Sequence, residues 1–402
     1  MTTPQEQLNH VENETKSKSP DSGLDSDEES DDDEEFHQQR MVDMEEQLLQ
    51  ACIATLSLTD GLRAEQQLED GNPEEEELEG PSPSLIESIR FTQEFIDEIR
   101  HATLDNGKLD KDVVNILRNP IEEPVDLSAP HIRLSLDLYV ACDNASEATY
   151  TAVRQSILRC FPECDVLSYY RVKQLVAESS GVVSVLDDMC INSCHAFVGP
   201  YADLTSCNKC SEPRYHVIRI GQTEKRVPRK QASTIPLGPQ IQALRRSPRG
   251  AAAMRYRDQK VMQVYDALDK LQNDENFVYD DIFCGNDFLN LSERYALTSN
   301  DTTVLFSLDG AQLYQNKKSD TWIAIWVILD YDPKTRYQSK HILPALIIPG
   351  PNKPKELDSF LFRGFHHLSS IQRENNGAGL RVWDGLQAAI VSSRIFFHPR
   401  HC

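Results

Sequence analysis

The spacing of apolar residues changes twice along this chain. Apolar residues are sparse in residues 1–80, and from Ser84 onward they recur with helical spacing, at Ile86, Ile89, Phe91, Phe95, Ile96 and Ile99. Two later stretches, 146–160 and 169–178, have the same spacing. We therefore predict a helical region over residues 84–180, preceded by a segment whose apolar content is too low to offset the entropy of folding.

A basic connector, residues 219–300, follows further along the chain. Its first half is interrupted by Pro228, Pro236, Pro239 and Pro248. Residues 251–271 then place their apolar side chains on one stripe, which predicts a single amphipathic helix.

The pattern becomes strand-like from Thr302. The predicted elements are strands at 304–309, 321–330 and about 341–348, a helix at 357–372 and a short strand at 394–397. Strands followed by a helix and another strand predict an α/β layer over residues 301–402.

Charge is distributed very unevenly. Residues 1–80 hold 25 Asp and Glu against four Lys and Arg, whereas the remainder holds 39 acids and 37 bases. This composition predicts that the acidic tail, 1–80, is disordered. The start of the chain lacks the apolar stretch of a secretory signal, and the longest strongly apolar run, 322–329, is too short to cross a bilayer. We expect a soluble intracellular protein with no membrane partner.

The most specific chemical signal is a set of four cysteines, Cys190-x3-Cys194 and Cys207-x2-Cys210. Cysteines in a chain without an export signal indicate reduced thiols rather than disulfides. Two short pairs joined by a loop are typical of a tetrahedral Zn²⁺ site, in which each pair forms one knuckle. We predict a structural zinc centre with no open position for a substrate. As alternatives, the cysteines could be small core residues, and His195 or His216 could replace one thiolate.

The connector is also the most basic part of the chain. Residues 219–260 hold eleven Lys and Arg against Glu224 and Asp258. Clustered cations bind phosphates through counterion release, although the same residues could form a solvated helix face and a loop. We predict nucleic-acid contact, and residues 225–230 also have the composition of a nuclear import signal. The predicted DNA-binding residues are Lys225, Arg226, Arg229, Lys230, Arg245, Arg246, Arg249, Arg255 and Arg257.

Asp309 is the residue most suggestive of catalysis. It ends the apolar run of a predicted strand and precedes Gly310. Two-metal enzymes place carboxylates at such strand ends, because Mg²⁺ prefers oxygen ligands. Asp-Gly is also a common turn, so the alternative is a strand-ending turn without chemistry.

Several of these segments together resemble the transposases of CACTA-type (En/Spm-like) DNA transposons, especially their fungal branch. The similarity extends from about residue 169 to 384, over half of the chain. The matching segments are MCINSC at 189–194, CNKCSEPRY at 207–215, SLDGAQLY at 307–314, IPGPNKP at 348–354 and LDSFL at 357–361.

The resemblance implies an RNase H-like core with an Asp-Asp-Glu triad, two divalent metal ions and cut-and-paste transfer of DNA. Asp309 would be the first acid of that triad, and the four cysteines would form a zinc-ribbon-like module ahead of the core. Mg²⁺ or Mn²⁺ would bind only if the core were complete. The resemblance also implies transposon ends as the DNA partner and association with itself or with related transposases.

The last residues depart from the family pattern. After a Trp-Asp pair such as Trp383-Asp384, the family has a strand that ends in a second acid. Residues 393–402 here contain no acid, and the glutamate is absent too. The other aspartates of this region, Asp320, Asp330, Asp332 and Asp384, lie elsewhere in the motif order. Because one carboxylate holds a catalytic metal pair poorly, the sequence predicts a core truncated before its catalytic set is complete.

The fold class expected from all of this is a multi-domain α+β chain. The expected parts are an acidic tail at 1–80, a helical region at 84–180, a zinc-ribbon-like module at 181–218, a basic connector and long helix at 219–300, and an incomplete RNase H-like core at 301–402. The expected function is nuclear DNA binding without cut-and-paste activity. Two alternatives remain: a non-enzymatic regulator whose acidic tail recruits partners, and a mis-predicted fragment of an active transposase.

Overall fold

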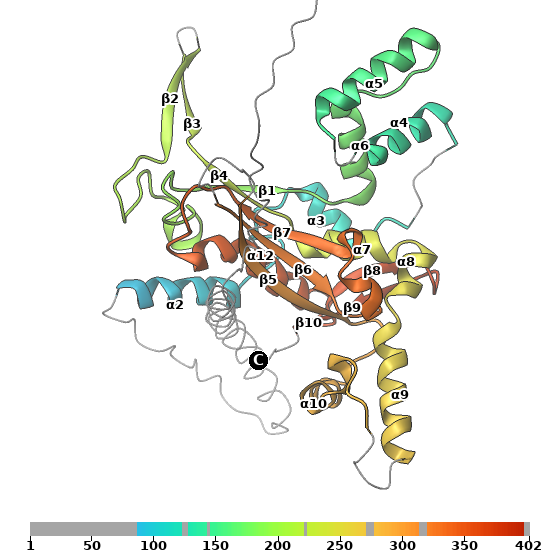
Figure 1. Ribbon diagram of the computed structural model, residues 1–402. Helices are drawn as coiled ribbons and strands as arrows, with labels where there is room; N and C mark the ends of the chain where they lie inside the picture. The colour runs from blue at the N-terminus through green and yellow to red at the C-terminus, as the bar shows by residue number, and fades with distance from the viewer. Residues whose placement is uncertain are drawn as a thin grey trace, which may run out of the picture. The chain divides into compact units, whose positions relative to one another are not determined.

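The computed structural model describes residues 87–122, 128–142, 145–220, 223–270, 277–312 and 320–397 (Figure 1). The expected acidic tail, 1–80, and residues 398–402 lie outside the described residues. Within the described ranges the chain is a mixture of α-helices and β-strands, so the α+β class is confirmed. None of the helices in these ranges is both long enough and apolar enough to cross a membrane.

A six-stranded sheet forms the centre of the fold. Its strands, in spatial order, are β1 (Val185–Asp188), β4 (Gln231–Thr234), β7 (Ile342–Ile348), β6 (Asp320–Ile328), β5 (Thr302–Gln312) and β10 (Ile395–Phe397). All neighbours are antiparallel except β10, which runs parallel to β5. The strands predicted from the apolar runs are confirmed, and β1 and β4 join them from the region before the core.

Helix α12 (Leu357–Arg373) covers one face of this sheet. Phe365 of α12 lies 5.7 Å from the ring of Phe306 on β5, which in turn lies 4.5 Å from the ring of Trp326 on β6. Side chains alternate between faces along a strand, so the even-numbered residues of β5 point toward α12. After α12 the chain forms the hairpin β8 (Leu380–Asp384) and β9 (Ala389–Ser393) and then enters β10.

The opposite face of the sheet is partly covered by three consecutive helical elements, which we call the arm. These are α9 (Tyr256–Lys270), η3 (Ile282–Cys284) and α10 (Asn286–Arg294). Phe283 and Phe288 of the arm pack with Val327 and Leu329, and Leu305 of β5 packs against the same cluster. The odd-numbered residues of β5 therefore face away from α12.

The single helix predicted over 251–271 is wrong in its first turns. The structure has α8 (Pro248–Ala253), which begins with a capping bond from the Gly250 N–H to Ser247 Oγ, and then a break before α9. At the break, Met254 is buried and Arg255 forms an ion pair with the buried carboxylate of Asp384, so long-range contacts accompany the interruption. Sequence periodicity cannot register such a long-range contact.

The described residues of the region 84–180 are mainly helical, and their helices pack in two groups. The helices are α2 (Glu87–Arg100), α3 (Lys111–Arg118), α4 (Pro130–Ala141), α5 (Glu147–Cys160) and α6 (Tyr169–Ser180). Helix α2 lies against α12 through Phe95 and Phe362, whose rings are 5.3 Å apart. Helices α4 to α6 surround their own aromatic cluster, in which Tyr150 lies 5.5 Å from the ring of Tyr169. Helix α7 (Leu237–Arg245) follows β4 and packs against α12. Its Gly238 N–H donates to Nε2 of the buried His367 on α12 at 3.1 Å.

Candidate metal centre

The first cysteine pair forms a tight turn directly after β1. The Ser193 N–H donates to the Cys190 carbonyl at 2.8 Å, and the Cys190 N–H donates to the His195 carbonyl at 3.0 Å. Ser193 has a φ of 56°, a left-handed conformation that lets the chain reverse. The Asn192 N–H lies 3.4 Å from Cys190 Sγ and points a donor at the sulfur.

The second pair repeats this geometry. The Ser211 N–H donates to the Cys207 carbonyl at 2.9 Å, and the Cys207 N–H donates to the Glu212 carbonyl at 2.9 Å. Ser211 has a φ of 60°, and the Lys209 N–H lies 3.4 Å from Cys207 Sγ. Both loops therefore supply backbone donors that favour thiolate sulfur, which is the form that binds a metal.

The two turns bring all four sulfurs together. The ligand atoms of Cys190, Cys194, Cys207 and Cys210 lie within 4.8 Å of one another. Four ligands at a Zn–S distance of about 2.3 Å would be roughly 3.8 Å apart at tetrahedral angles, so the spacing fits such an ion. The four cysteines are free thiols, and three of them are buried. The predicted convergence of this set is confirmed, and it could hold a metal such as zinc.

Histidine does not complete the set. His195 is fully buried, and its Nδ1 lies 2.9 Å from the Ala196 carbonyl, while its ring packs against Phe197 and Tyr201. His216 lies on an exposed strand. Within the described ranges, the cysteine quartet is the single group of three or more ligating side chains close enough to share a metal, and neither histidine belongs to it.

Burial and hydrogen bonding act in opposite directions on these thiols. Burial raises the pKa of Cys194, and it raises the pKa of Cys207 to about 11. Burial also raises the pKa of Cys210, but hydrogen bonds from the Glu212 N–H and the Asn192 amide outweigh it and lower the value to about 7. A metal that binds here must displace protons from the buried thiols, which makes its affinity fall in acid.

Two basic residues that the sequence assigned to DNA instead brace the knuckles. Lys230 is half-buried, and its Nζ donates to Ser193 Oγ at 3.0 Å. Burial lowers the pKa of Lys230, and the nearby Cys190 acts in the opposite direction. Arg229 forms an ion pair of 2.5 Å with Glu212. Lys230 and Arg229 precede β4, so their contacts fix both knuckles to the start of that strand. They also fix one end of the segment 215–228, which lies between the second knuckle and β4.

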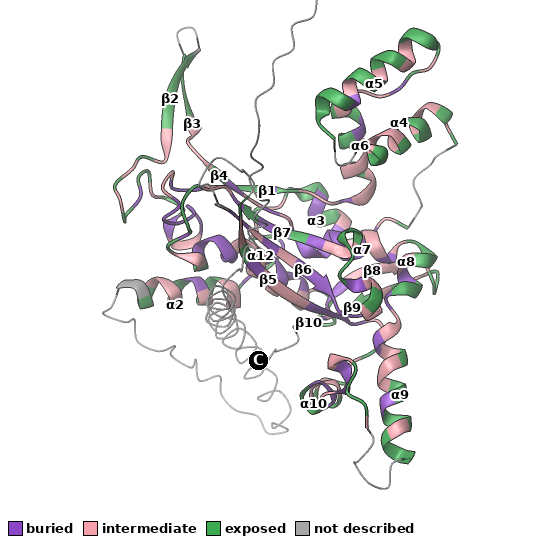
Figure 2. Ribbon diagram, viewed as in Figure 1, coloured by how far each residue is buried: buried purple, intermediate pink, exposed green. Residues whose placement is uncertain are grey.

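Between the second knuckle and β4, the chain forms a two-stranded ribbon, β2 (Tyr215–Ile220) and β3 (Thr223–Pro228). Figure 2 shows the ribbon exposed along most of its length. Lys225 and Arg226 are exposed on β3, and neither forms an ion pair with a carboxylate of the described residues. Arg219 on β2 pairs with Glu224 across the ribbon at 3.0 Å. Of the predicted DNA contacts, Lys225 and Arg226 are therefore available to a ligand.

The centre is also bonded to the start of α12. The Lys355 N–H donates to the Ser193 carbonyl at 3.1 Å, and the Glu356 N–H donates to the Cys194 carbonyl at 2.9 Å. Lys209, in the second knuckle, forms an ion pair of 2.7 Å with Glu356. A metal at the cysteines would thus hold β1, the ribbon and α12 to one another.

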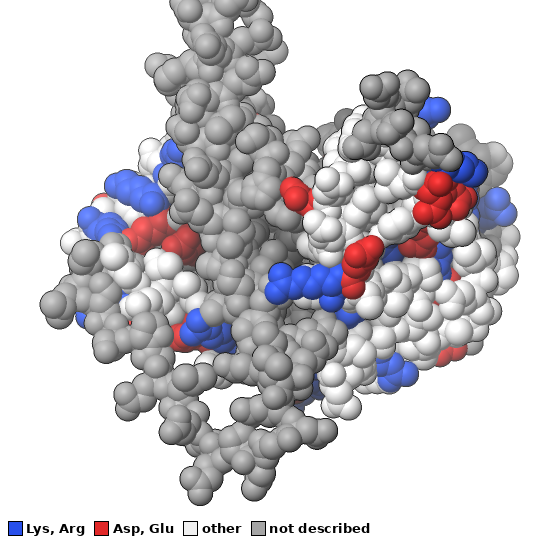
Figure 3. Space-filling model, turned by 90° about the horizontal axis from the view of Figure 1, so that it is seen from below, with Lys and Arg blue, Asp and Glu red and all other residues white. Residues whose placement is uncertain are grey.

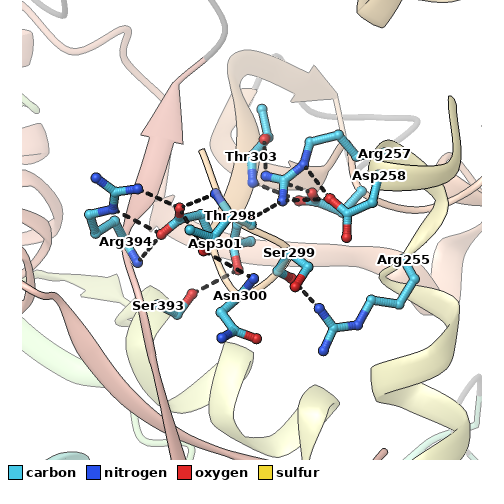
Figure 4. Close-up of polar contacts among 12 residues, drawn as sticks. Arg255, Arg257, Asp258, Thr298, Ser299, Asn300, Asp301, Thr303, Ser393 and Arg394 are labelled. Atoms are coloured by element: carbon cyan, nitrogen blue, oxygen red, sulfur yellow. Dashed lines mark hydrogen bonds and ion pairs between the residues drawn. The ribbon is translucent and has the colours of Figure 1, made fainter. Parts of the chain in front are cut away.

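The other predicted DNA contacts lie at the opposite end of the sheet. Arg245 is 2% exposed and pairs with Asp384 at 2.6 Å, and Arg255 pairs with the same carboxylate at 2.7 Å. Arg257 is also buried and pairs with Asp330 at 3.2 Å. Figure 4 shows Arg255 and Arg257 directed at the 298–301 loop that precedes β5.

These three arginines are therefore paired within the protein and offer no free charge at the surface. Their guanidinium groups satisfy buried carboxylates and loop carbonyls, because an unpaired charge in this position would carry a large desolvation cost. Burial raises the pKa of the carboxyl of Asp330 to about 6, although Arg257 opposes this effect. Arg246 is half-buried and donates to the Ser179 carbonyl, while Arg249 is exposed on α8.

Asp309 lies within β5 rather than at its end. The strand continues to Gln312, and Asp309 pairs with Ile323 of β6. Gly310 is also part of the strand, where an added Cβ would lie 3.1 Å from the Trp322 ring, so the alternative of an Asp-Gly turn is wrong. Asp309 is exposed on the face away from α12 and belongs to no group of three ligating side chains in the part of the chain that is described.

Sequence reasoning missed the residues that connect the centre to the rest of the fold. Glu356 and the lysines Lys353 and Lys355 lie in the loop between β7 and α12, which overlaps the resemblance motif at 348–354 but received no role from the sequence. Lys353 Nζ lies 5.2 Å from the centroid of the Trp322 ring. The signal that could have found them is the density of lysine in this loop, but the spacing gives no indication that it contacts a knuckle some 160 residues earlier in the chain.

Comparison of the sequence with models of known protein families and with curated proteins finds no match to either.

Proposed function

We propose that this protein is a DNA-binding chain related to the CACTA-type transposases, with a structural zinc centre and without cut-and-paste activity. The apolar pattern predicts three strands, a helix and a further strand, and the motif resemblance implies that they form an RNase H-like core. Strands β5, β6 and β7, helix α12 and strand β10 follow that order, with β10 next to β5. This order supports an RNase H-like core that has Asp309 on its first strand.

The observation that carries DNA binding is the exposed basic ribbon rooted in the cysteine centre. A two-stranded β-ribbon fits the major groove of duplex DNA, and exposed Lys and Arg contact its phosphates. Lys225 and Arg226 have no competing carboxylate within the described ranges, whereas the buried arginines at the other end of the sheet are already paired. Among the described residues visible in Figure 3, small groups of Lys and Arg alternate with small groups of Asp and Glu, so these residues form no continuous basic surface on that side.

Zinc is the ion that this site would take. Four thiolates at tetrahedral spacing select Zn²⁺ over oxygen-preferring ions such as Mg²⁺. The set offers no obvious open position, so the ion would stabilise the knuckles and would not act on a substrate. With this DNA-binding role we expect the chain to act in the nucleus. Residues 225–230 would serve as its import signal.

Neutralising the ribbon is expected to weaken DNA binding. The variant Lys225→Gln/Arg226→Gln should bind a 30-base-pair duplex of random sequence about tenfold more weakly at low salt, because two phosphate contacts are lost. The slope of log affinity against log salt should fall by about 1.8, at about 0.9 per contact. Fluorescence anisotropy over a salt series measures both quantities.

The control is Arg171→Gln/Lys173→Gln, which removes two exposed charges from α6. It should leave affinity and slope within about twofold of the parent, since charge far from the contact adds little at moderate ionic strength. Equal losses in the two variants would mean that the ribbon has no special role.

The absence of cleavage can be tested in the same preparation. With Mg²⁺ or Mn²⁺, the parent chain and Asp309→Asn should both leave supercoiled plasmid intact at background level, because one carboxylate does not hold a catalytic metal pair. Agarose gels resolve nicked from supercoiled plasmid. Nicking by the parent that disappears in Asp309→Asn would overturn this part of the proposal.

A further inference from the structure

Several features of the fold meet at one end of the central sheet. Strand β1 ends there and leads into the first knuckle, and β4 begins there after the ribbon. Strand β7 ends there in the loop 349–356, and the antiparallel pairing of β5 with β6 places the second half of β5, including Asp309, at the same end. The ribbon, the knuckles, this loop and Asp309 therefore lie at the same end of the sheet, where β1 and β7 end and β4 begins.

The loop 349–356 contacts the first knuckle at one end and β6 further along. Strand β6 is the neighbour of β5, which carries Asp309. At one end, its Lys355 N–H is bonded to the Ser193 carbonyl of the first knuckle. Further along, Lys353 lies over the ring of Trp322, the residue of β6 that pairs with Gly310 of β5. Trp322 and Gly310 belong to the set of residues that faces α12, so this cation lies on the sheet face opposite to the side chain of Asp309.

At this end of the sheet, most of the charged side chains that form no ion pair are positive. Three acids near the knuckles are paired, Glu356 with Lys209, Asp188 with Arg214, and Glu212 with Arg229. The exposed acids Asp203 and Asp309 form no ion pair among the described residues, so they are negative charges that oppose the cations here. Lys353 and Lys355 are exposed, and neither forms an ion pair with a carboxylate of the residues that the structure describes. Together with Lys225 and Arg226 they leave four cations without an anion.

We propose that the loop 349–356 is a second DNA-backbone contact, which continues the basic surface of the ribbon across the knuckles to the end of the sheet at Trp322 of β6. The inference rests on the proposed DNA binding and assigns it a path. The partner is duplex DNA, whose regularly spaced phosphates can be met in succession by cations from separate elements. Trp322 keeps the Lys353 ammonium group at this end of the sheet, since a cation is attracted to the face of an indole ring.

The test is the variant Lys353→Gln/Lys355→Gln, compared with Lys334→Gln/Lys340→Gln. The control lysines are exposed at the other end of β7, in α11 (Pro333–Arg336) and η4 (Ser339–His341). With the metal-loaded full chain and a 30-base-pair random duplex, the loop variant should bind about tenfold more weakly, with a salt slope lower by about 1.8. The control should stay within about twofold.

A second measurement does not depend on affinity. A photo-crosslinking amino acid at position 352, between Pro351 and Lys353, should attach to the duplex, whereas the same group at position 340 should not. Crosslinking at both positions or at neither would overturn the proposed path. Tighter binding of a poly-glutamate peptide than of the duplex would show that this end of the sheet recognises acidic protein instead.

The outcomes separate this inference from the proposed function. If the parent chain does not bind the duplex, the proposed function fails. If the parent binds and the ribbon variant Lys225→Gln/Arg226→Gln binds weakly, but the loop variant matches its control, DNA binding stands and the loop contact is refuted.

Discussion

Replacing Cys207 with serine is expected to reduce bound zinc from about one ion per chain to about none at micromolar concentration, because a tetrahedral site loses one of four thiolates. Cys207 is buried, and its N–H and carbonyl also hold the turn through Glu212 and Ser211. Metal release should therefore loosen the second knuckle, from which the ribbon begins. Metal content per chain, measured by mass spectrometry of the element, tests this directly.

The structural consequence should be local. In zinc-finger peptides the ion contributes an apparent ~10–16 kcal/mol to folding, but here the six-stranded sheet has its own core and should persist. Trypsin is expected to cut at Arg219, Lys225 and Arg226 at least tenfold faster in Cys207→Ser than in the parent, since local unfolding exposes the ribbon. DNA affinity should fall at least as much as in the ribbon variant.

Cys160→Ser is the matched control. Cys160 is exposed at the end of α5 and lies outside the quartet, so its loss should change neither metal content nor cleavage by trypsin. Retention of zinc at parental affinity in Cys207→Ser would show that the quartet is not the metal centre.

Replacing Asp384 with alanine is expected to destabilise the core by about 3–5 kcal/mol, the usual cost of leaving a buried charge without its partner. Asp384 is fully buried and forms ion pairs with both Arg245 and Arg255. Burial raises the pKa of Asp384, but the hydrogen bonds from Arg245 and the Gln387 N–H outweigh it and lower the value overall. The carboxylate also accepts the Leu386 and Gln387 N–H groups at 3.0 Å, which fixes the β8–β9 turn.

Urea denaturation followed by tryptophan fluorescence measures this change. Asp137→Ala is a suitable comparison, because Asp137 pairs with Arg133 at 3.9 Å on the surface of α4, with its side chain 74% exposed. Exposed pairs contribute about 0–1 kcal/mol. A loss in Asp384→Ala no larger than in Asp137→Ala would contradict a structural role for the arginine cluster.

Much of the fold could be predicted from the sequence where the determinants are local. The apolar runs predicted β5, β6, β7, β10 and α12, since side-chain periodicity follows from backbone geometry. The cysteine spacing predicted the quartet, because each x3 or x2 pair closes its own turn. The break between α8 and α9 was not predicted, since local periodicity does not register the long-range contacts that accompany it.

The basic connector shows the limit most clearly. Its composition suggested one surface of nine DNA-binding residues, but the structure sends its two halves to opposite ends of the sheet. Lys225 and Arg226 remain exposed, whereas Arg245 and Arg257 are buried with Asp384 and Asp330. Those carboxylates lie 139 and 73 residues further along the chain, and no local pattern encodes such pairings.

The sequence by itself determined the main strands of residues 302–397, helix α12 and the thiol cluster, because these depend on residues within a few positions of one another. The ribbon strands β2 and β3 were not predicted from it. Only the tertiary structure decided which cations are exposed to a ligand and which are paired inside the core. It also placed Asp309, Lys353 and the ribbon at one end of the sheet. The reason is that burial and charge pairing depend on which distant segments meet.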